Sequence, residues 1–475
     1  MFINGEWNNA ESGREFPSYN PASGETIGKV PDGEAIDARK AIDAAAGAFP
    51  KWSSQTVYQR SQFLYRAHAL MMENLEHLAA VMTEEQGKPI QAARNEVRYA
   101  ADFLVWYAEE AKRIYGQTIP SARADQRFIV LRQPVGVVAA ITPWNYPISM
   151  ITRKVAPAMA AGCTIVLKPA EATPLCAKAV FEILEAAGIP EGVVNLVTAQ
   201  TPGPIGELFL TDPRIRKLTF TGSTGVGKML ARGAAEQMKR VSLELGGHAP
   251  FIVCQDADPV RAATGLSLVK FLNTGQACIS PNRIFVHEEA IDAFINELTR
   301  RVSAMKAGSG FDTSVRIGPL VNEAALDKVD RQVKDAVAKG AELVAGGRRL
   351  TEDGLDRGFF YAPTILRGVT PEMIIYREET FGPVAPIITY NDADDLLAMA
   401  NDTRYGLASY VYTNDLKNAF TLFEGLQFAI VGINDINPTS AAAPFGGMKE
   451  SGLGREGGIQ GLDDYLETKV GGFSI

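Results

Sequence analysis

The feature that most constrains the fold is a regular alternation of strand-like and helix-like segments that begins at residue 135. Short apolar runs are separated there by longer stretches with helical periodicity. Alternation at this spacing predicts a parallel sheet with helices on both faces, which is an α/β fold. Ligands of such sheets bind at the carboxyl ends of the strands. The expected strands of this first region are Val135–Ile141, Thr164–Leu167, Val193–Val197 and Lys217–Phe220.

A second alternating region follows Gly247 and opens with the apolar run Pro250–Cys254. A chain of 475 residues is long enough to bury more than one core, so we expect two or more domains. Residues 117–134 differ from both regions, because they read as β structure with charged flanks. We interpret that stretch as an excursion out of the first domain.

Composition argues against several classes of protein. The formal net charge of −8 disfavours nucleic acid as a partner, since phosphate binding needs basic patches. The N-terminus lacks the basic and apolar regions of a signal peptide, and no apolar run is long enough to span a membrane. Four cysteines without framework spacing indicate a cytoplasmic protein. No metal site is expected, because the four histidines are scattered: His68, His77, His248 and His287.

One cysteine, Cys278, stands in a setting that suits chemistry. It follows the polar segment Asn273–Gln276, and Pro281 shortly after it discourages a long helix. A thiol in a polar, glycine-containing loop is accessible and can ionise, whereas a free cysteine is most often a small buried hydrophobe. The second description fits the three cysteines that lie in apolar runs: Cys163, Cys176 and Cys254.

Upstream of that loop, Glu244 stands between two leucines and is followed by the glycine pair Gly246–Gly247. An isolated glutamate in apolar surroundings usually has a raised pKa, which suits a general base. The alternative is a glutamate at a helix end or in a salt bridge, and the residue taken alone favours that alternative.

Polar motifs also follow the ends of the expected strands. Asn145 offers an amide donor of the kind that an oxyanion needs, and the alternative is a turn asparagine. Lys168 and Glu171 come after the next strand, where they could bind the two hydroxyls of a ribose; the alternative is a charged loop. The glycine-rich stretch Phe220–Lys228 follows a strand and opens a helix, so its backbone N–H groups suit a pyrophosphate. Its spacing differs from both the GxGxxG and the Walker A motif.

These motifs, together with the glycine-dense stretch Ala443–Gly457, resemble the NAD(P)-dependent aldehyde dehydrogenase superfamily over essentially the whole chain. The resemblance implies an aldehyde-dehydrogenase-like fold with a Rossmann-type cofactor domain, an α/β catalytic domain and a small β oligomerisation region. The implied NAD-binding domain is 1–116 and 135–247, and the catalytic domain with the nucleophile is 248–445. The oligomerisation region is 117–134 and 463–475, and residues 446–462 return to the cofactor domain.

The resemblance also implies a role for each candidate residue. The catalytic set is Cys278 as nucleophile, Glu244 as general base, Asn145 as oxyanion donor together with the Cys278 backbone N–H, and Lys168. The residues expected to contact the cofactor are Trp144, Lys168, Glu171, Gly222, Ser223, Leu245, Glu379 and Phe381. Because a carboxylate at Glu171 would repel a 2′-phosphate, NAD is expected in preference to NADP.

The implied reaction is the NAD-dependent oxidation of an aldehyde to the carboxylic acid. The Cys278 thiolate attacks the aldehyde to give a thiohemiacetal, whose collapse expels hydride to the nicotinamide and leaves a thioester. Glu244 then activates the water that releases the acid. A homodimer or homotetramer follows from the resemblance alone.

Within the family, the motifs look most like the succinate-semialdehyde dehydrogenase branch, which implies a small semialdehyde as substrate. Arg153 is the candidate partner of a substrate carboxylate, and the alternative is an arginine on a helix surface. Two positions depart from that branch, because Leu272 stands where an arginine is usual and Ser280 where a second cysteine is usual. The stretches around His248 and Ser280 instead look like some 2-oxoglutarate-semialdehyde dehydrogenases. Uncharged aliphatic or aromatic aldehydes are a further alternative.

Two other functions stay open at this point. A CoA-acylating dehydrogenase would pass the acyl group to CoA rather than to water, and the presence of Glu244 argues against it. A non-enzymatic scaffold of the same fold would be free to lose part of the catalytic set, and this chain keeps all of it.

Overall fold

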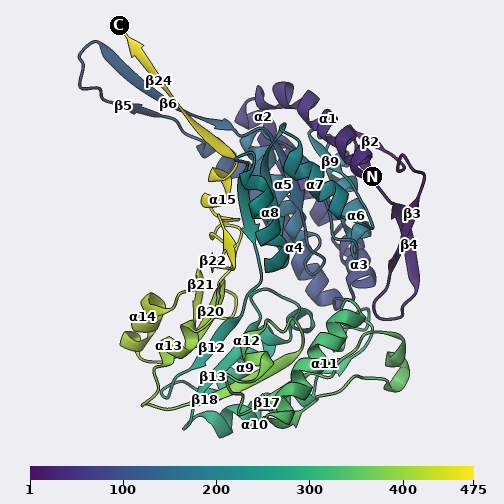
Figure 1. The fold of residues 1–475 in the computed structure, drawn as a ribbon, viewed down its shortest axis with the longest axis vertical. Coiled ribbons are helices and arrows are strands. Elements are labelled where there is room, and N and C mark those ends of the chain that lie inside the picture. The colour runs from purple at the N-terminus through teal and green to yellow at the C-terminus, as the bar shows by residue number, and fades with distance from the viewer.

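The protein folds into two α/β units and a β hairpin that projects from one of them (Figure 1). The structure is a computed structural model and describes residues 1–475. Each unit is built on its own sheet, and helices cover both faces of the first one. The α/β fold class predicted from the alternation of segments is therefore confirmed.

The first sheet has eight strands in the order β2-β1-β9-β8-β7-β10-β11-β23, and its five central strands run parallel. The central strands are β7 (Val137–Ile141), β8 (Thr164–Lys168), β9 (Val194–Leu196), β10 (Ile215–Thr221) and β11 (Arg240–Glu244). The antiparallel edge strands are β1 (Phe2–Ile3), β2 (Glu6–Trp7) and β23 (Gly452–Leu453). The four strands expected in this region all form, with ends that shift by up to two residues.

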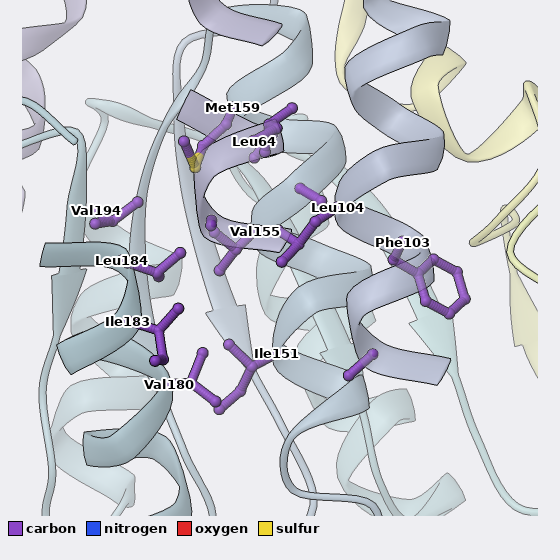
Figure 2. Packing of buried hydrophobic residues seen from close by; sticks show 14 of the residues in the cluster. Leu64, Phe103, Leu104, Ile151, Val155, Met159, Val180, Ile183, Leu184 and Val194 are labelled. Carbon is purple, nitrogen blue, oxygen red and sulfur yellow. The ribbon is translucent and has the colours of Figure 1, made fainter. Parts of the chain in front are cut away.

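Helices pack on both faces of this sheet because alternate residues of each strand point to opposite sides. Val138 belongs to the larger core, whereas its neighbour Val137 belongs to a second core on the other face. Figure 2 shows the larger core, where side chains of four helices meet those of the sheet. The helices of this unit are α1 (Ala35–Ser53), α2 (Val57–Glu73), α3 (Leu75–Gln86), α4 (Ile90–Glu110), α5 (Ser149–Ala161), α6 (Pro174–Ala186), α7 (Gly203–Thr211) and α8 (Thr224–Ala235).

The second sheet has seven strands in the order β16-β17-β18-β13-β12-β20-β21. All its pairings are parallel except that of β16 with β17. Its strands are β12 (Ala249–Val253), β13 (Pro281–His287), β16 (Glu342–Ala345), β17 (Thr364–Arg367), β18 (Val384–Tyr390), β20 (Ala408–Tyr412) and β21 (Ile430–Ile433). The main helices around it are α9 (Pro259–Lys270), α10 (Ile291–Ser303), α11 (Glu323–Ala338), α12 (Ile374–Arg377), α13 (Leu396–Asn401) and α14 (Leu416–Gly425).

A third, antiparallel sheet extends away from the body of the molecule and ends at the C-terminus (Figure 1). It consists of β5 (Gln117–Ile119), β6 (Gln126–Pro134) and β24 (Leu466–Ser474). Nine residues of β24 pair with nine of β6, so the two β-like segments expected to form the oligomerisation region lie side by side. Smaller ribbons are β3 (Glu15–Tyr19) with β4 (Thr26–Pro31), β14 (Lys306–Ala307) with β15 (Val315–Ile317), and β19 (Tyr405–Gly406) with β22 (Met448–Lys449).

The three sheets use the stretches of chain that the sequence analysis assigned to separate regions, and the domain boundaries themselves stay a prediction. No helix is both long and apolar enough to span a bilayer. No three His, Cys, Asp or Glu side chains gather in a way that could hold a metal ion.

Candidate active site

The candidate site lies where the first sheet faces the second. The first sheet contributes residues beyond the carboxyl ends of its strands, which is where open α/β sheets bind ligands. Asn145 follows β7, Ser223 follows β10 and Glu244 ends β11. The second sheet contributes the segments that lead into its strands, because Cys278 precedes β13 and Glu379 precedes β18.

Two cavities meet at Cys278. One, of about 330 Å³, is lined by residues predicted to contact the cofactor: Trp144, Gly222, Ser223, Leu245, Glu379 and Phe381. The other, of about 300 Å³, is more apolar and is lined by Tyr146, Met150, Arg153, Leu272, Ile436 and Phe445 among others. Cys278 lines both cavities. Its thiol can therefore contact one ligand on each side.

The loop before Cys278 has an unusual backbone. Asn273, Thr274 and Gly275 have φ angles of 49°, 59° and 75°, so three consecutive residues adopt the left-handed conformation. Residues other than glycine rarely adopt this conformation, and such backbone strain persists only where surrounding contacts impose it. A Cβ at Gly275 would lie 2.1 Å from the Gly382 carbonyl oxygen, so the two backbones meet too closely for a larger residue.

Burial keeps the Cys278 thiol protonated in the ligand-free protein. Burial and, after it, the Glu244 carboxyl raise the pKa of this thiol to about 12, although the Arg153 guanidinium opposes both. Accessibility distinguishes Cys278 from the other cysteines, because it is half-buried and faces two cavities while the other three are buried. The prediction that Cys278 differs in setting agrees with this placement, and its role stays a prediction.

Glu244 is buried, and neither of its carboxyl oxygens has a hydrogen-bond partner. Burial and the charge of Glu456 raise its pKa well above the ordinary value. A carboxylate with a raised pKa is a stronger base once it has ionised. The residues that follow Glu244 lie close to the nucleophile, since a Cβ at Gly247 would be 2.2 Å from the Cys278 carbonyl oxygen.

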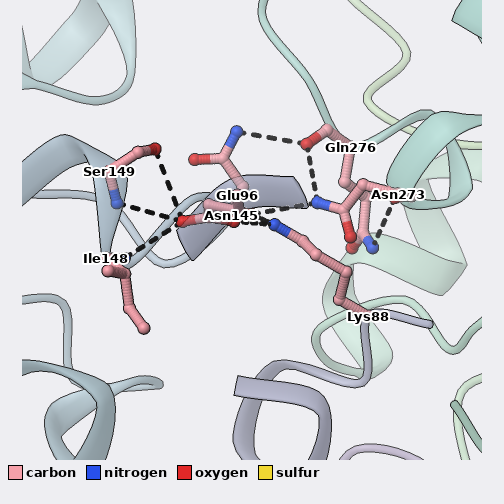
Figure 3. Close-up of polar contacts among 7 residues, drawn as sticks. All are labelled: Lys88, Glu96, Asn145, Ile148, Ser149, Asn273 and Gln276. Atoms are coloured by element: carbon pink, nitrogen blue, oxygen red, sulfur yellow. Dashed lines mark hydrogen bonds and ion pairs between the residues drawn. The ribbon is translucent and has the colours of Figure 1, made fainter. Parts of the chain in front are cut away.

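Asn145 lies beside the loop that carries Cys278 and is hydrogen-bonded to it. Its Nδ2 donates to the Gln276 carbonyl oxygen at 3.1 Å, two residues before Cys278 (Figure 3). The side chain is buried and lines the cofactor-side cavity together with Cys278. The structure thus brings the amide to the nucleophile loop, as an oxyanion donor requires.

Arg153 lies on α5, a helix whose thirteen residues are all buried, so the alternative of a surface arginine is wrong. Its Nε is 2.9 Å from Glu456 Oε2, and its guanidinium lies over the Phe445 ring at 4.1 Å. Burial lowers the pKa of Arg153, but the Glu456 carboxylate and other nearby groups outweigh burial and the net pKa is raised, so the side chain is charged. Nη2 has no partner, and the residue lines the apolar cavity.

Glu456 is a buried charge that the sequence analysis did not single out. Besides Arg153, it pairs with Lys154. Burial raises the pKa of Glu456, but the Lys154 and Arg153 charges lower it more, so the carboxylate stays ionised beside Glu244. The sequence feature that could have indicated Glu456 is its position as an acidic residue within the glycine-dense stretch Ala443–Gly457.

The cofactor-side cavity combines two aromatic rings with the start of a helix. Trp144 and Phe381 approach edge to face with ring centroids 5.5 Å apart. Helix α8 begins after Ser223 with no side-chain cap, so its first N–H groups are free to bind phosphate. Glu379 accepts a hydrogen bond from Gly247 N at 2.8 Å.

The remaining predicted cofactor residues lie at or just beyond the carboxyl ends of β8 and β11. Lys168 ends β8 and forms an ion pair with Glu171, whose side chain is partly exposed. The Leu245 backbone N–H donates to the Ser451 carbonyl oxygen at 2.9 Å, so it is already used within the protein. A cysteine that lines two cavities, one of them bordered by a free helix N-terminus, is the arrangement expected of a nicotinamide-dependent oxidoreductase that acts through a thiol.

The sequence model of the Aldehyde dehydrogenase family matches residues 7–470, and the chain belongs to this family. It is 49% identical, over 97% of this chain and 93% of the relative, to a "Probable succinate-semialdehyde dehydrogenase [NADP(+)]" of Sinorhizobium fredii. It is 48% identical, over 98% of this chain and 96% of the relative, to a "Glutarate-semialdehyde dehydrogenase" of Pseudomonas putida. A crystal structure of an E. coli NADP-dependent enzyme superposes with a TM-score of 0.97 at 48% identity, covering 100% of this chain and 98% of that one. The protein is thus an aldehyde dehydrogenase, an oxidoreductase that converts an aldehyde to an acid with a pyridine nucleotide.

Proposed function

We propose that Cys278 is the nucleophile of this aldehyde oxidation and that Asn145 and Glu244 act beside it. One observation carries the proposal: Cys278 lines both the cofactor-side and the apolar cavity. A covalent intermediate on this sulfur would be in contact with both ligands at once, which the reaction requires. Trp144, Glu379 and Phe381 would hold the nicotinamide end of the cofactor.

The reaction begins when the Cys278 thiol loses its proton to solvent and the resulting thiolate forms a bond to the aldehyde carbon, whose C=O electron pair moves to the oxygen. The oxygen becomes an oxyanion, which the Asn145 amide and the Cys278 backbone N–H stabilise. The bound nicotinamide supplies an acceptor for the hydride, and a thioester remains on the sulfur. Glu244 then removes a proton from water, the oxygen attacks the thioester carbon, and the carbon–sulfur bond breaks to release the acid.

Replacement of Cys278 tests this assignment. Cys278→Ala is expected to abolish NAD(P)H formation while cofactor binding, followed by fluorescence titration, stays as in the wild type. Turnover of this variant at the wild-type rate would show that Cys278 is not the nucleophile. Formation of an acyl-CoA with no free acid when CoA is added would favour the CoA-acylating alternative instead.

For the cofactor, the proposal is a preference for NAD over NADP. Glu171 supports it, because its carboxylate is partly exposed and would repel a 2′-phosphate bound beside it. The relative from Sinorhizobium fredii is named for NADP(+), so the two cofactors need a direct comparison. Glu171→Ser is expected to raise the ratio of kcat/KM for NADP to that for NAD by on the order of tenfold, because one repulsive charge contact with the 2′-phosphate is removed. Glu182→Gln, which removes a surface carboxylate from α6, is the matched control. A wild-type preference for NADP would overturn the proposal.

The proposed substrate is a small semialdehyde that carries a carboxylate. Arg153 supports this choice, since Nη2 of its charged guanidinium is unpartnered and the residue lines the apolar cavity. Leu272 lines the same cavity and supplies no second charge. Both named relatives are dehydrogenases of semialdehydes, which carry one carboxylate besides the aldehyde group.

A panel of matched aldehydes decides between charged and uncharged substrates. Initial rates are measured for two pairs of equal chain length: succinate semialdehyde with butanal, and glutarate semialdehyde with pentanal. 2-Oxoglutarate semialdehyde and benzaldehyde are measured beside them. The proposal expects the charged member of each pair to have a kcat/KM higher by about 100-fold, the value of two charge-assisted hydrogen bonds. Leu272→Arg should widen that difference. If butanal equals succinate semialdehyde, an uncharged substrate is favoured.

We also propose a homo-oligomer in the cytoplasm. The projecting sheet of β5, β6 and β24 supports an oligomer because it leaves apolar side chains exposed, among them Leu131, Val470 and Phe473. All four cysteines are free, which suits a reducing compartment.

A further inference from the structure

A buried ion pair outside the predicted catalytic set lies beneath the candidate oxyanion donor. Lys88, in the short connection between α3 and α4, pairs with Glu96 on α4. Both side chains are 1% exposed. The Lys88 ammonium also lies 3.8 Å from the centre of the Tyr146 ring. Because burying two charges costs free energy, a buried pair is weak evidence for stability and calls for another explanation.

The ammonium reaches the backbone of Asn145. Lys88 Nζ donates to the Asn145 carbonyl oxygen at 2.9 Å, and Asn273 Nδ2 donates to the same oxygen at 3.0 Å. Figure 3 shows the two donors converging on that oxygen. Residues 142–147 form no helix or strand, so these two hydrogen bonds restrain a peptide that regular structure does not.

Glu96, the partner of Lys88, binds the start of α5. Its Oε1 accepts hydrogen bonds from Ile148 N and Ser149 N, both at 3.1 Å (Figure 3). These N–H groups belong to the first turn of a helix, where no helical carbonyl is available to them. The ion pair therefore binds the loop of Asn145 at two points: Lys88 binds its middle, at Asn145, and Glu96 binds its end, at Ile148 and Ser149.

On its other side, Asn145 is joined to the nucleophile loop. Asn145 Nδ2 donates to the Gln276 carbonyl oxygen, and Asn273 Nδ2 donates to that oxygen at 3.2 Å. Lys88 thus holds the backbone of Asn145, and the loop of Cys278 holds its side chain. The side-chain amide of Asn145 is the proposed donor to the oxyanion. An error of a fraction of an ångström in such a donor weakens transition-state stabilisation.

We propose that Lys88 and Glu96 are positioning residues for the oxidation: the ion pair fixes the peptide of Asn145 and so aims its amide at the reacting oxygen. The inference rests on the proposed role of Asn145. Lys88 and Glu96 border the apolar cavity, but their charged groups bind each other and the loop of Asn145, so in this scheme both act through Asn145.

Lys88→Met, Glu96→Gln and the double variant test the proposal. Methionine keeps much of the length of the lysine, and glutamine keeps an acceptor for the two N–H groups of α5. The double variant leaves no unpaired buried charge, so it is the one best able to fold. It is expected to lose on the order of tenfold in kcat/KM for the aldehyde, a part of the roughly 100-fold to 1,000-fold cost of removing an oxyanion donor. Binding of the cofactor should not change.

The decisive comparison repeats these changes in an Asn145→Ala background. If Lys88 and Glu96 act through Asn145, the double change should cost almost nothing further there, because coupled residues are non-additive. Asp212→Asn is the matched control, since Asp212 is a buried carboxylate paired with Arg214 at the opposite end of β10. It should lower the melting temperature without changing kcat.

Three results would overturn the inference. The first is a folded double variant with wild-type kcat/KM while Asn145→Ala loses activity, which would refute the positioning role alone. The second is a double change that costs as much in the Asn145→Ala background as in the wild type. The third is full activity of Asn145→Ala, which would refute the oxyanion role itself and the inference with it.

Discussion

At the scale of single residues, the site is a set of buried charges that offset one another. Glu456 stays ionised between Lys154 and Arg153, while Glu244, which has no such partner, holds its proton more tightly. The charges of Glu244 and Arg153 also act on the Cys278 thiol. Protonation in this site is therefore decided by neighbours that are far away in the sequence.

The reactivity of Cys278 should follow its raised pKa. Only the thiolate is alkylated, and burial raises the pKa to about 12 in the ligand-free protein. The rate of alkylation by iodoacetamide should thus rise about tenfold per pH unit from about pH 7 to about pH 9.5 without a plateau, as the thiolate fraction does well below a pKa. The rate is measured by mass spectrometry of the Cys278 peptide. A plateau below about pH 9 would show that the thiol is already ionised.

Glu244→Gln should separate the two halves of the reaction. Glutamine cannot accept the proton of water, so the thioester forms and then persists. Stopped-flow measurements are expected to show a burst of about one NAD(P)H per active site, followed by turnover slowed by roughly 100-fold or more, the usual contribution of a general base. Intact mass should show the acyl group on the protein. An unchanged steady state with no burst would assign the base elsewhere.

At the scale of elements, helix α6 illustrates how a distant residue completes a helix. Its N-cap Thr173 makes no side-chain cap. Instead, buried Glu85 of α3 accepts hydrogen bonds from Leu175 N and Cys176 N, both at 2.7 Å. A carboxylate at a helix N-terminus is favourable, yet burial raises the pKa of Glu85 from 4.5 to about 7.

This shift predicts a pH dependence of stability. The folded protein binds the proton of Glu85 more tightly than the unfolded chain does, so the stabilisation from this proton is present below pH 4.5 and is lost as the pH rises to about 7. A shift of this size is worth about 3 kcal/mol. Glu85→Gln does not titrate, so its melting temperature relative to the wild type should be higher at about pH 8 than at about pH 5. A difference that does not change with pH would contradict the raised pKa.

At the scale of the whole molecule, the β6–β24 pairing joins segments more than 300 residues apart in the chain. It carries exposed apolar side chains away from both α/β units: Ile129, Leu131, Val470, Phe473 and Ile475. A projecting sheet with such a surface is a ready template for association with another copy.

Removal of residues 466–475 should therefore change the assembly. The deletion takes away the whole partner of β6 and leaves that strand with only the short β5. Light scattering should give a multiple of the monomer mass for the full chain and a lower mass for the truncated chain. The smaller truncation of residues 472–475 keeps most of the pairing and tests whether loss of the chain end alone matters. A full-length protein that runs as a monomer would contradict the proposed oligomer.

Local sequence was enough to predict the family and four of the five central strands of the first sheet. Strands β7 and β8 at the centre of the first sheet are nearly continuous apolar runs, as expected of parallel strands that are buried on both faces. The catalytic candidates were found because each interrupts such a pattern: Cys278 in a polar loop, Glu244 between leucines and Asn145 in a turn. Each of these signals is contained within a few neighbouring residues, which is the range over which periodicity and turn chemistry operate.

The contacts between distant segments were decided only by the tertiary structure. Nothing near Arg153 indicates that it pairs with Glu456 about 300 residues later, and nothing near Lys88 indicates that it holds the Asn145 carbonyl. Such partners are chosen by how buried helices and loops pack, because a charge without water must find whichever opposite charge or acceptor the fold brings to it. The sequence by itself therefore determined which residues are candidates for the chemistry, and the packing of the two units determined which residues hold them in place.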